Sequence, residues 1–442
     1  MEVYLQQYHQ SFGGHTNLLD TQSKKTFFIQ GSWMLSATMI SGLLMFAVHF
    51  FGGWMTRNEY GLFVTLLQAL NLIMIPALGL QTVFAQQTAT ANTSIEQSNL
   101  SISIRKILLS CIIIWMLSVI ILIIFRASIL SIFKINNSLA FYLTLVIGLP
   151  QLCLPVLLGI LQGQQNFQWL GGASITNGLI RFIIIGIMVA VLGAQSTGAL
   201  FGVLVGLTAS CTIAAWHSRN IWEKRKAKNG SFNPNHWLRR IIPLTFGLGA
   251  SQFMLSADML AARNILQEGD SGPYGAAGMI GRGLVIFTAP LAAVMFPKIA
   301  NSSESFKFSI LKYTASRTTF LSILVCTMSS LTAWLLPLIS EHMTVLSQRQ
   351  KIITEITTLI PYFTWSMLPL ALANVYITAL LAREKYKGIP LLIIIASSYA
   401  LALILLSNKT TPPNNETIIL ILGFFNLVYL AAARYLTKQL DD

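Results

Sequence analysis

Charged residues are scarce in this chain. Asp, Glu, Lys and Arg make up only 10% of its 442 residues, whereas hydrophobic residues make up 54%. A soluble domain carries roughly a quarter charged residues, so this composition excludes an ordinary soluble fold. Acidic residues are the fewest, 15 against 29 Lys and Arg, which leaves a net charge of +14.

Cysteine is also rare. The four cysteines, Cys111, Cys153, Cys211 and Cys326, all lie in apolar segments. They are too scattered for a metal site and are predicted to be small buried apolar residues. We therefore expect no metal centre.

Catalytic motifs are missing as well. The chain has no Gly-rich nucleotide loop with its Lys, no His-Glu-x-x-His and no nucleophile elbow. The loops are too short for a soluble catalytic domain, so we expect no enzyme and no organic cofactor. Residues 1–25 are polar and lack an apolar core, so no cleaved signal peptide is predicted and the first helix serves for insertion.

Apolar residues are abundant and fall in blocks of about 20, the length that crosses a bilayer core. In lipid every backbone group must be satisfied inside the segment, so these blocks are predicted to be helices. The predicted fold class is an all-α polytopic membrane protein. Its twelve spans lie at residues 27–52, 60–87, 104–126, 138–162, 168–193, 197–216, 241–266, 273–297, 317–340, 354–382, 388–407 and 415–436.

The basic residues are distributed unevenly over the loops. With both termini inside, the inner termini and loops carry 20 of the 29 Lys and Arg and the outer loops carry seven; Arg181 and Arg282 lie within spans. The positive-inside rule then makes both termini cytoplasmic. The excess basic charge is interpreted as facing anionic lipid headgroups, not nucleic acid. We expect a multi-pass protein of the plasma (inner) membrane of a bacterium.

The one long basic linker, residues 217–240, separates two halves of six helices. The predicted organisation is a cytoplasmic N-terminal segment (1–26), an N-lobe (27–216), this linker, a C-lobe (241–436) and a cytoplasmic tail (437–442). A spacing of 214 residues relates the halves. Three pairs fall on it: Tyr60 and Tyr274, Pro76 and Pro290, and Pro155 and Pro369. Chance placement is the alternative. A duplicated unit with an even number of helices predicts parallel repeats around a central cavity.

Two opposite charges lie in adjacent spans of the C-lobe. Asp258 and Arg282 are both roughly 12–13 Å below the outer surface at 1.5 Å per residue. One interpretation is an ion pair that only holds two helices together. The other is a water-filled cavity in which Arg282 binds an anionic group and Asp258 holds a proton or cation.

Arg181 lies near the middle of the fifth span, where a charge is most costly. Ser174, Asn177 and Arg181 follow one helix face, and no acidic residue of the first six spans is available as a partner. This pattern indicates a cavity that accepts anions; a packing residue capped by carbonyls is the alternative. In the second span, Gln68 and Asn71 form a weaker stripe that suits either sugar hydroxyls or helix packing. His49, close to the outer end of the first span, is interpreted as interfacial, with a proton switch as the alternative.

Three stretches resemble the polysaccharide branch of the multidrug/oligosaccharidyl-lipid/polysaccharide exporter superfamily. Residues 59–63 (Glu-Tyr-Gly-Leu-Phe) look like the start of its second helix, and residues 158–167 look like the cytoplasmic end of its fourth. Asp258 followed by residues 272–275 (Gly-Pro-Tyr-Gly) resembles the pattern between its seventh and eighth helices.

The resemblance implies two six-helix lobes around a central cavity that work by alternating access. The implied substrate is a polyprenyl-pyrophosphate-linked oligosaccharide carried to the outer leaflet for polysaccharide export, with Arg181 and Arg282 as cavity cations. Candidate partners are membrane lipids, a polysaccharide polymerase and glycosyltransferases, and the energy source is left open between a proton and a sodium gradient. Residues 27–52 lack the early basic residues of the related lipid II flippases, which usually have fourteen helices.

Two other functions are open to this chain. A cation-coupled multidrug or small-molecule exporter of the same superfamily is the main alternative, and Asp258 keeps it open. The drug-exporting branch, however, typically has acidic residues in its first lobe, and the N-lobe spans here have none. A membrane scaffold that binds a glycosyltransferase is the rival class, but it has no need for an unpaired Arg181 in mid-membrane.

Overall fold

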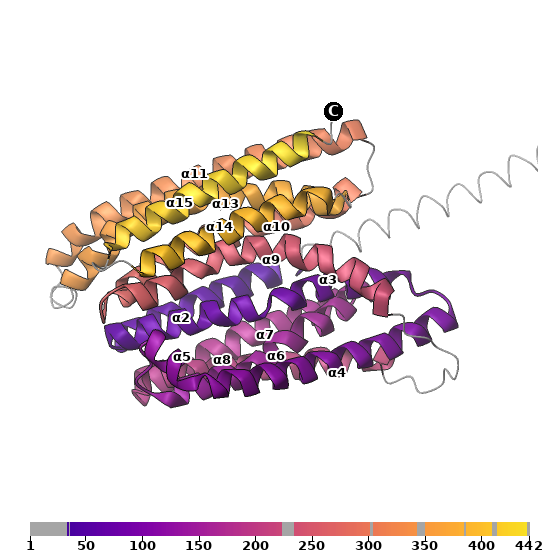
Figure 1. Cartoon of the computed structure of the whole chain (residues 1–442), viewed down its shortest axis with the longest axis horizontal. Helices are drawn as coiled ribbons and strands as arrows, with labels where there is room; N and C mark the ends of the chain where they lie inside the picture. Colours follow the sequence, from indigo (N-terminus) through magenta and orange to yellow (C-terminus); the bar gives the residue numbers. More distant parts are fainter. Residues whose placement is uncertain are drawn as a thin grey trace, which may run out of the picture.

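The computed structural model describes residues 33–34, 36–222, 234–300, 304–342, 350–383, 386–408 and 413–439. Within these ranges the chain is almost wholly helical and contains no strand. The helices run along one common axis and form two stacked groups (Figure 1). The lower group in this view holds the helices before the basic linker and the upper group those after it, so the two predicted lobes are distinct bundles.

The N-lobe begins with a first span, Ser36–Trp54, which ends in the 3-10 helix η1 (Val48–Trp54). It continues through α2 (Arg57–Ile73), α3 (Ile75–Thr90), α4 (Ser94–Ile124), α5 (Arg126–Ile132), α6 (Ser138–Gly163), α7 (Phe167–Ile185), the π-helix η2 (Gly186–Val191) and α8 (Gln195–Trp222). The C-lobe consists of α9 (Pro234–Ile265), α10 (Ser271–Ala300), α11 (Glu304–His342), α13 (Gln350–Ala382), η3 (Tyr386–Gly388), α14 (Ile389–Ser407) and α15 (Asn415–Lys438).

Ten helical segments of the described residues are long and apolar enough to cross a membrane, and α2 with α3 makes a bent eleventh. The twelfth is α9, which has 32 residues but is less apolar. It packs against α2, α3, α10 and α14, and its polar residues Ser256, Asp258 and Arg263 are buried. The prediction of twelve helices in two lobes is confirmed.

Two local features differ from the predicted spans. The span expected at 60–87 is broken between α2 and α3 by a bend of 46°. Pro76 lies in the first turn of α3, where its missing N–H prevents α2 from continuing but is tolerated at a helix start. The third span is followed by a separate short helix, α5, which has no buried side chain.

The same helix neighbours recur in both lobes. In the N-lobe, α6 packs against α3, α4 and α8, and α8 also packs against α7. In the C-lobe, α13 packs against α10, α11 and α15, and α15 also packs against α14. These are the equivalent helices when the chain is counted as two sets of six, as a duplicated unit requires.

The described residues beside the connections from each odd span to the even span after it lie at one end of the bundle. Contacts there join Thr56 with Gln195, Arg263 with Lys134, and Arg57 with Glu355. Asn414, from the last of these connections, lines a pocket together with Glu355. We call this the Arg57 end; the charge distribution predicts it to face outward.

The lobes meet where α2 and α3 pack against α9 and α10. At three positions the backbones approach so closely that only glycine fits. A Cβ on Gly61 of α2 would overlap Ser271 of α10, one on Gly272 of α10 would overlap the carbonyl of Arg57 of α2, and one on Gly79 of α3 would overlap Thr245 of α9. Small residues serve the same purpose at membrane helix interfaces in general.

Some predicted boundaries lie outside the described residues. These are the N-terminal segment 1–26, the linker residues 223–233 and the last part of the tail, 440–442. The assignment of these segments therefore stays a prediction.

Candidate functional site

The α9–α10 hairpin places Asp258 and Arg282 opposite each other. Arg282 Nη2 donates to Asp258 Oδ2 at 2.6 Å, and the two side chains are 1% and 0% exposed. Arg282 Nε also donates to the carbonyl of Leu255, at 2.9 Å. The hairpin thus contains a buried ion pair whose basic partner is additionally fixed by the backbone of α9.

This ion pair does not use all of its hydrogen-bonding atoms. Within the described part of the chain, Asp258 Oδ1 and Arg282 Nη1 are buried and have no hydrogen-bond partner. The guanidinium carbon of Arg282 lies 6.0 Å from the ring centre of Phe363 in α13. A buried N–H without a partner is unfavourable, so Arg282 retains a donor that a ligand would satisfy.

A tyrosine at the start of the second helix of each lobe bonds back to an ionisable residue of the preceding helix. Tyr274 donates its hydroxyl to Asp258 Oδ2 at 3.0 Å. Tyr60, its counterpart at the 214-residue spacing, lies 3.0 Å from His49 Nδ1. In the sequence, the 214-residue spacing identifies both tyrosines as part of the repeat but does not predict these hydrogen bonds. Their equivalent positions in the two lobes are the sequence signal that points to a shared role.

Arg181 lies in α7, ten residues before the end of η2, which puts it about 15 Å from the Arg57 end. Arg282 lies 11 residues into α10, at a similar depth. Arg181 is half-buried, and no salt bridge to it occurs among the described residues. Its Nε is buried and has no hydrogen-bond partner there, nor has Oδ1 of the neighbouring Asn177. Arg181 is therefore a second cation with unused donor capacity.

The first span lies between these two arginines. On its N-lobe side, Ser41 Oγ donates to the carbonyl of Ser174 in α7 at 2.8 Å. On its C-lobe side, the Phe46 ring faces Gly283, the residue after Arg282. Gly178 of α7 and Gly186 at the start of η2, which flank Arg181 in the sequence, face Leu44 and Phe51 of the same span. The first span therefore packs between the two helices that carry Arg181 and Arg282.

The remaining predicted residues divide between the lobe interface and helix packing. Gln68 is buried on α2, donates to Met279 Sδ of α10 at 3.6 Å, and accepts from Asn71 at 3.2 Å. Met279 lies about one turn from Arg282, so both amides are near that cation. Ser174 instead donates to the carbonyl of Leu170 within its own helix. Its hydroxyl is already satisfied there.

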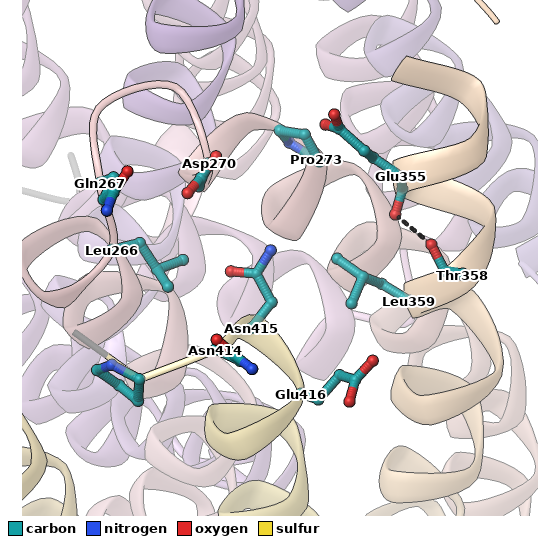
Figure 2. Close-up of a pocket in the computed structure, with 11 residues that line it drawn as sticks. Leu266, Gln267, Asp270, Pro273, Glu355, Thr358, Leu359, Asn414, Asn415 and Glu416 are labelled. Carbon is teal, nitrogen blue, oxygen red and sulfur yellow. Dashed lines mark hydrogen bonds between the residues drawn. The ribbon is translucent and has the colours of Figure 1, made fainter. Parts of the chain in front are cut away.

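A separate pocket of about 380 Å³ opens at the Arg57 end of the C-lobe. Figure 2 shows its walls, which come from the α9–α10 loop and the starts of α13 and α15. Three carboxylates line it, those of Asp270, Glu355 and Glu416. Glu355 pairs with Arg57 of the N-lobe, so one wall belongs to a contact between the lobes. In the described residues no cluster of three or more His, Cys, Asp or Glu has the arrangement of a metal site.

Arg263, in the last turn of α9, is buried and only 2% exposed. It donates to the carbonyls of Phe133, Lys134 and Asn58 and to the hydroxyl of Ser271. It therefore connects three loops at the Arg57 end.

The whole fold is similar to known transporters. An inward-facing multidrug resistance MATE family transporter of the MOP superfamily matches with a TM-score of 0.69 and 13% identity, covering 93% of this chain and 98% of that one. The lipid II flippase MurJ, in an inward closed conformation, matches with a TM-score of 0.67 and 13% identity, covering 93% and 87%. A MOP superfamily transporter from Pyrococcus furiosus matches with a TM-score of 0.56 and 12% identity, covering 93% and 94%.

Comparison with curated protein sequences gave no match. A family model described as "Polysaccharide biosynthesis protein" matches residues 29–303, more than half of the chain, which includes Asp258, Arg282 and Arg181. Together with the shared fold, this match supports a multi-pass membrane protein that acts as a flippase or exporter. The chain belongs to the polysaccharide biosynthesis protein family and has the fold of MOP superfamily transporters.

Proposed function

We propose that this protein moves a polyprenyl-pyrophosphate-linked oligosaccharide from the inner to the outer leaflet by alternating access. One observation carries the proposal. Arg181 and Arg282 lie at similar depth on helices of opposite lobes that both pack against the first span, and each keeps a buried nitrogen without a partner among the described residues. Two such donors at membrane depth suit an anionic ligand.

The chemistry of the substrate fits this pair of residues. A pyrophosphate carries at least two negative charges, which need cations in a low-dielectric site. A guanidinium donates two hydrogen bonds in a plane that matches phosphate oxygens. Because Arg181 and Arg282 belong to different lobes, an anion bound to both favours one relative position of the lobes. Gln68 and Asn71 provide amides next to this site for sugar hydroxyls.

Asp258 has a secondary role in this proposal. It fixes Arg282 and, through its unpartnered Oδ1, offers a place for a coupling proton or sodium ion. The acidic residues of the N-lobe helices are Glu59 and Glu96, both in first turns. The described N-lobe helices therefore have no carboxylate within the membrane that could form the first-lobe cation site of a drug exporter. We further propose that the Arg57 end faces outward and that both termini are cytoplasmic.

Reconstitution in liposomes tests the function. A fluorescent polyprenyl-pyrophosphate oligosaccharide is placed in both leaflets, and its exposure is followed by quenching from outside. The wild type should move the lipid, whereas Arg181→Gln and Arg282→Gln should each slow it at least tenfold. The matched control is Arg219→Gln. Arg219 lies over the exposed Trp216 ring in the last turns of α8, far from the Arg57 end. No movement by the wild type under any ion gradient, together with efflux of a cationic dye, would overturn the proposal in favour of the exporter.

A further inference from the structure

His49 is the ionisable group that the proposed function leaves unused. It lies in η1, near the end of the first span, five residues before Trp54. Aromatic rings surround it: the centres of the Tyr60 and Phe63 rings are both 6.0 Å away, and that of Phe46 is 6.3 Å away. Imidazole is a side chain that can change its charge near neutral pH when its environment favours the charged form, whereas a guanidinium stays charged.

Three neighbouring helices pack around the part of the first span that carries His49. The hydroxyl of Tyr60 on α2 lies 3.0 Å from Nδ1. Gly178 of α7 and Gly186 at the start of η2, which flank Arg181 in the sequence, face Leu44 and Phe51, and Gly283, the residue after Arg282 in α10, faces Phe46. His49 lies between Phe46 and Phe51 in the sequence, so the helices that carry the N-lobe cation and the C-lobe cation both pack against this part of the first span.

The bond to Tyr60 leaves the other ring nitrogen available. A tyrosine hydroxyl can donate or accept. When it donates to Nδ1, the neutral ring carries its proton on Nε2 and can donate from there. When the ring takes up a second proton, Nδ1 becomes the donor and Tyr60 accepts, so this hydrogen bond is kept in both charge states.

The charge state of the ring depends on what occupies the site. Burial among aromatic rings and the positive charge of two arginines both oppose a positive charge on the ring, so an empty site favours the neutral imidazole. A bound diphosphate reverses the local field and favours the imidazolium. The proton that is taken up then adds a charged hydrogen bond to the anion.

We propose that His49 is a third nitrogen donor for the anion held by Arg181 and Arg282, and that it takes up a proton when that anion binds. The inference rests on the proposed function, because it uses the same anion site. It adds a residue on the first span and a way in which substrate binding and proton binding depend on each other.

Calorimetric titration of the purified protein with farnesyl diphosphate in detergent tests the proposal. Titrations at pH 7 in two buffers with different ionisation enthalpies give the number of protons exchanged on binding. The diphosphate itself releases protons when it binds arginines, so the informative quantity is the difference between wild type and His49→Gln. We expect the variant to take up fewer protons, by up to one per bound anion. Its affinity at pH 6 should be roughly ten- to hundredfold weaker, the value of one charged hydrogen bond.

Two further variants complete the design. His217→Gln is the matched control, since His217 is stacked on Trp169 at the other end of α8 and should change neither quantity. Tyr60→Phe leaves the imidazole in place but removes its hydrogen bond, and it should give an intermediate loss of affinity; it keeps the test valid if His49→Gln does not fold.

Three results are distinguishable. A lower proton uptake and a weaker affinity in His49→Gln support the inference. Binding that depends on Arg181 and Arg282, but has the same proton count and affinity in His49→Gln or Tyr60→Phe as in the wild type, overturns the inference and leaves the proposed function standing. Absence of any binding by the wild type overturns the anion site itself, and the inference with it.

Discussion

Removing the two charges of the α9–α10 hairpin singly and together is the sharpest test of the ion pair. In Asp258→Asn, Arg282 keeps only the carbonyl of Leu255 as a partner and remains a charge with 1% exposure. In Arg282→Gln, the carboxylate keeps only the hydroxyl of Tyr274. Removing one partner of a buried pair costs about 3–5 kcal/mol, so we expect each single variant to lose about 3 kcal/mol of stability.

The double variant Asp258→Asn/Arg282→Gln has no buried charge left. Its two amides can bond to each other and to Tyr274, so we expect a total loss of about 3 kcal/mol, whereas independent effects would add to about 6 kcal/mol. The coupling energy is then about 3 kcal/mol, the upper end of what residues in contact show. The assay is equilibrium unfolding in mixed detergent micelles, followed by tryptophan fluorescence.

The partly exposed pair between Arg57 and Glu355 is the matched control for this cycle. Its side chains are 33% and 34% exposed, so the same cycle there should give at most about 1 kcal/mol. Additive losses at the Asp258–Arg282 pair would refute the reasoning. Transport separates the two roles of Arg282. If the double variant regains stability but not flipping, Arg282 contacts the anion. If flipping returns, Arg282 only holds the helices together.

Three more outcomes are expected. Gly79→Ala should separate the lobes and lower the melting temperature, because its Cβ would overlap α9, whereas Gly42→Ala has open space and should be neutral or slightly stabilising by thermal unfolding. Arg263→Lys keeps the charge but loses most of four hydrogen bonds and should lower the unfolding free energy by about 2–4 kcal/mol; a wild-type value would contradict its role in joining loops. Glu355→Gln removes the ion pair with Arg57 and should leave stability within about 1 kcal/mol. It should, however, lengthen spin-label distances between the lobes at the Arg57 end, and unchanged distances would show that the pair does not hold that end closed.

The spans were predictable because each must satisfy its backbone hydrogen bonds within the lipid, and because successive loops must lie on opposite sides of the membrane. This constraint identified α9, although its own apolar content is low, because only a helix there keeps the basic loops on one side. The break between α2 and α3 was not predicted. Pro76 in an apolar run signals either a kink or a new helix start, and the packing of α3 against α9 decides between them.

The site was predictable only where it is local. Asp258 and Arg282 belong to adjacent helices at matched depth, so their contact followed from helix geometry. The position of Arg181 relative to the C-lobe cation depends on how the two lobes pack, which no spacing in one chain reports. His49 was interpreted as interfacial because it lies close to a helix end. In the structure it is half-buried, and it contacts the hydroxyl of Tyr60 and the rings of Phe46 and Phe63.

The low apolar content of α9 has a consequence for biogenesis. An acidic or basic residue at the centre of a helix adds about 2.5–3.5 kcal/mol to the free energy of its insertion from the translocon. Such a helix is held poorly in the bilayer alone, whereas α10 follows after a short loop and brings the guanidinium that neutralises Asp258. The two helices are therefore expected to enter the membrane as one hairpin. The C-lobe then begins as a paired unit, and a variant of Arg282 is expected to reduce the amount of protein made in the membrane before any effect on transport is measured.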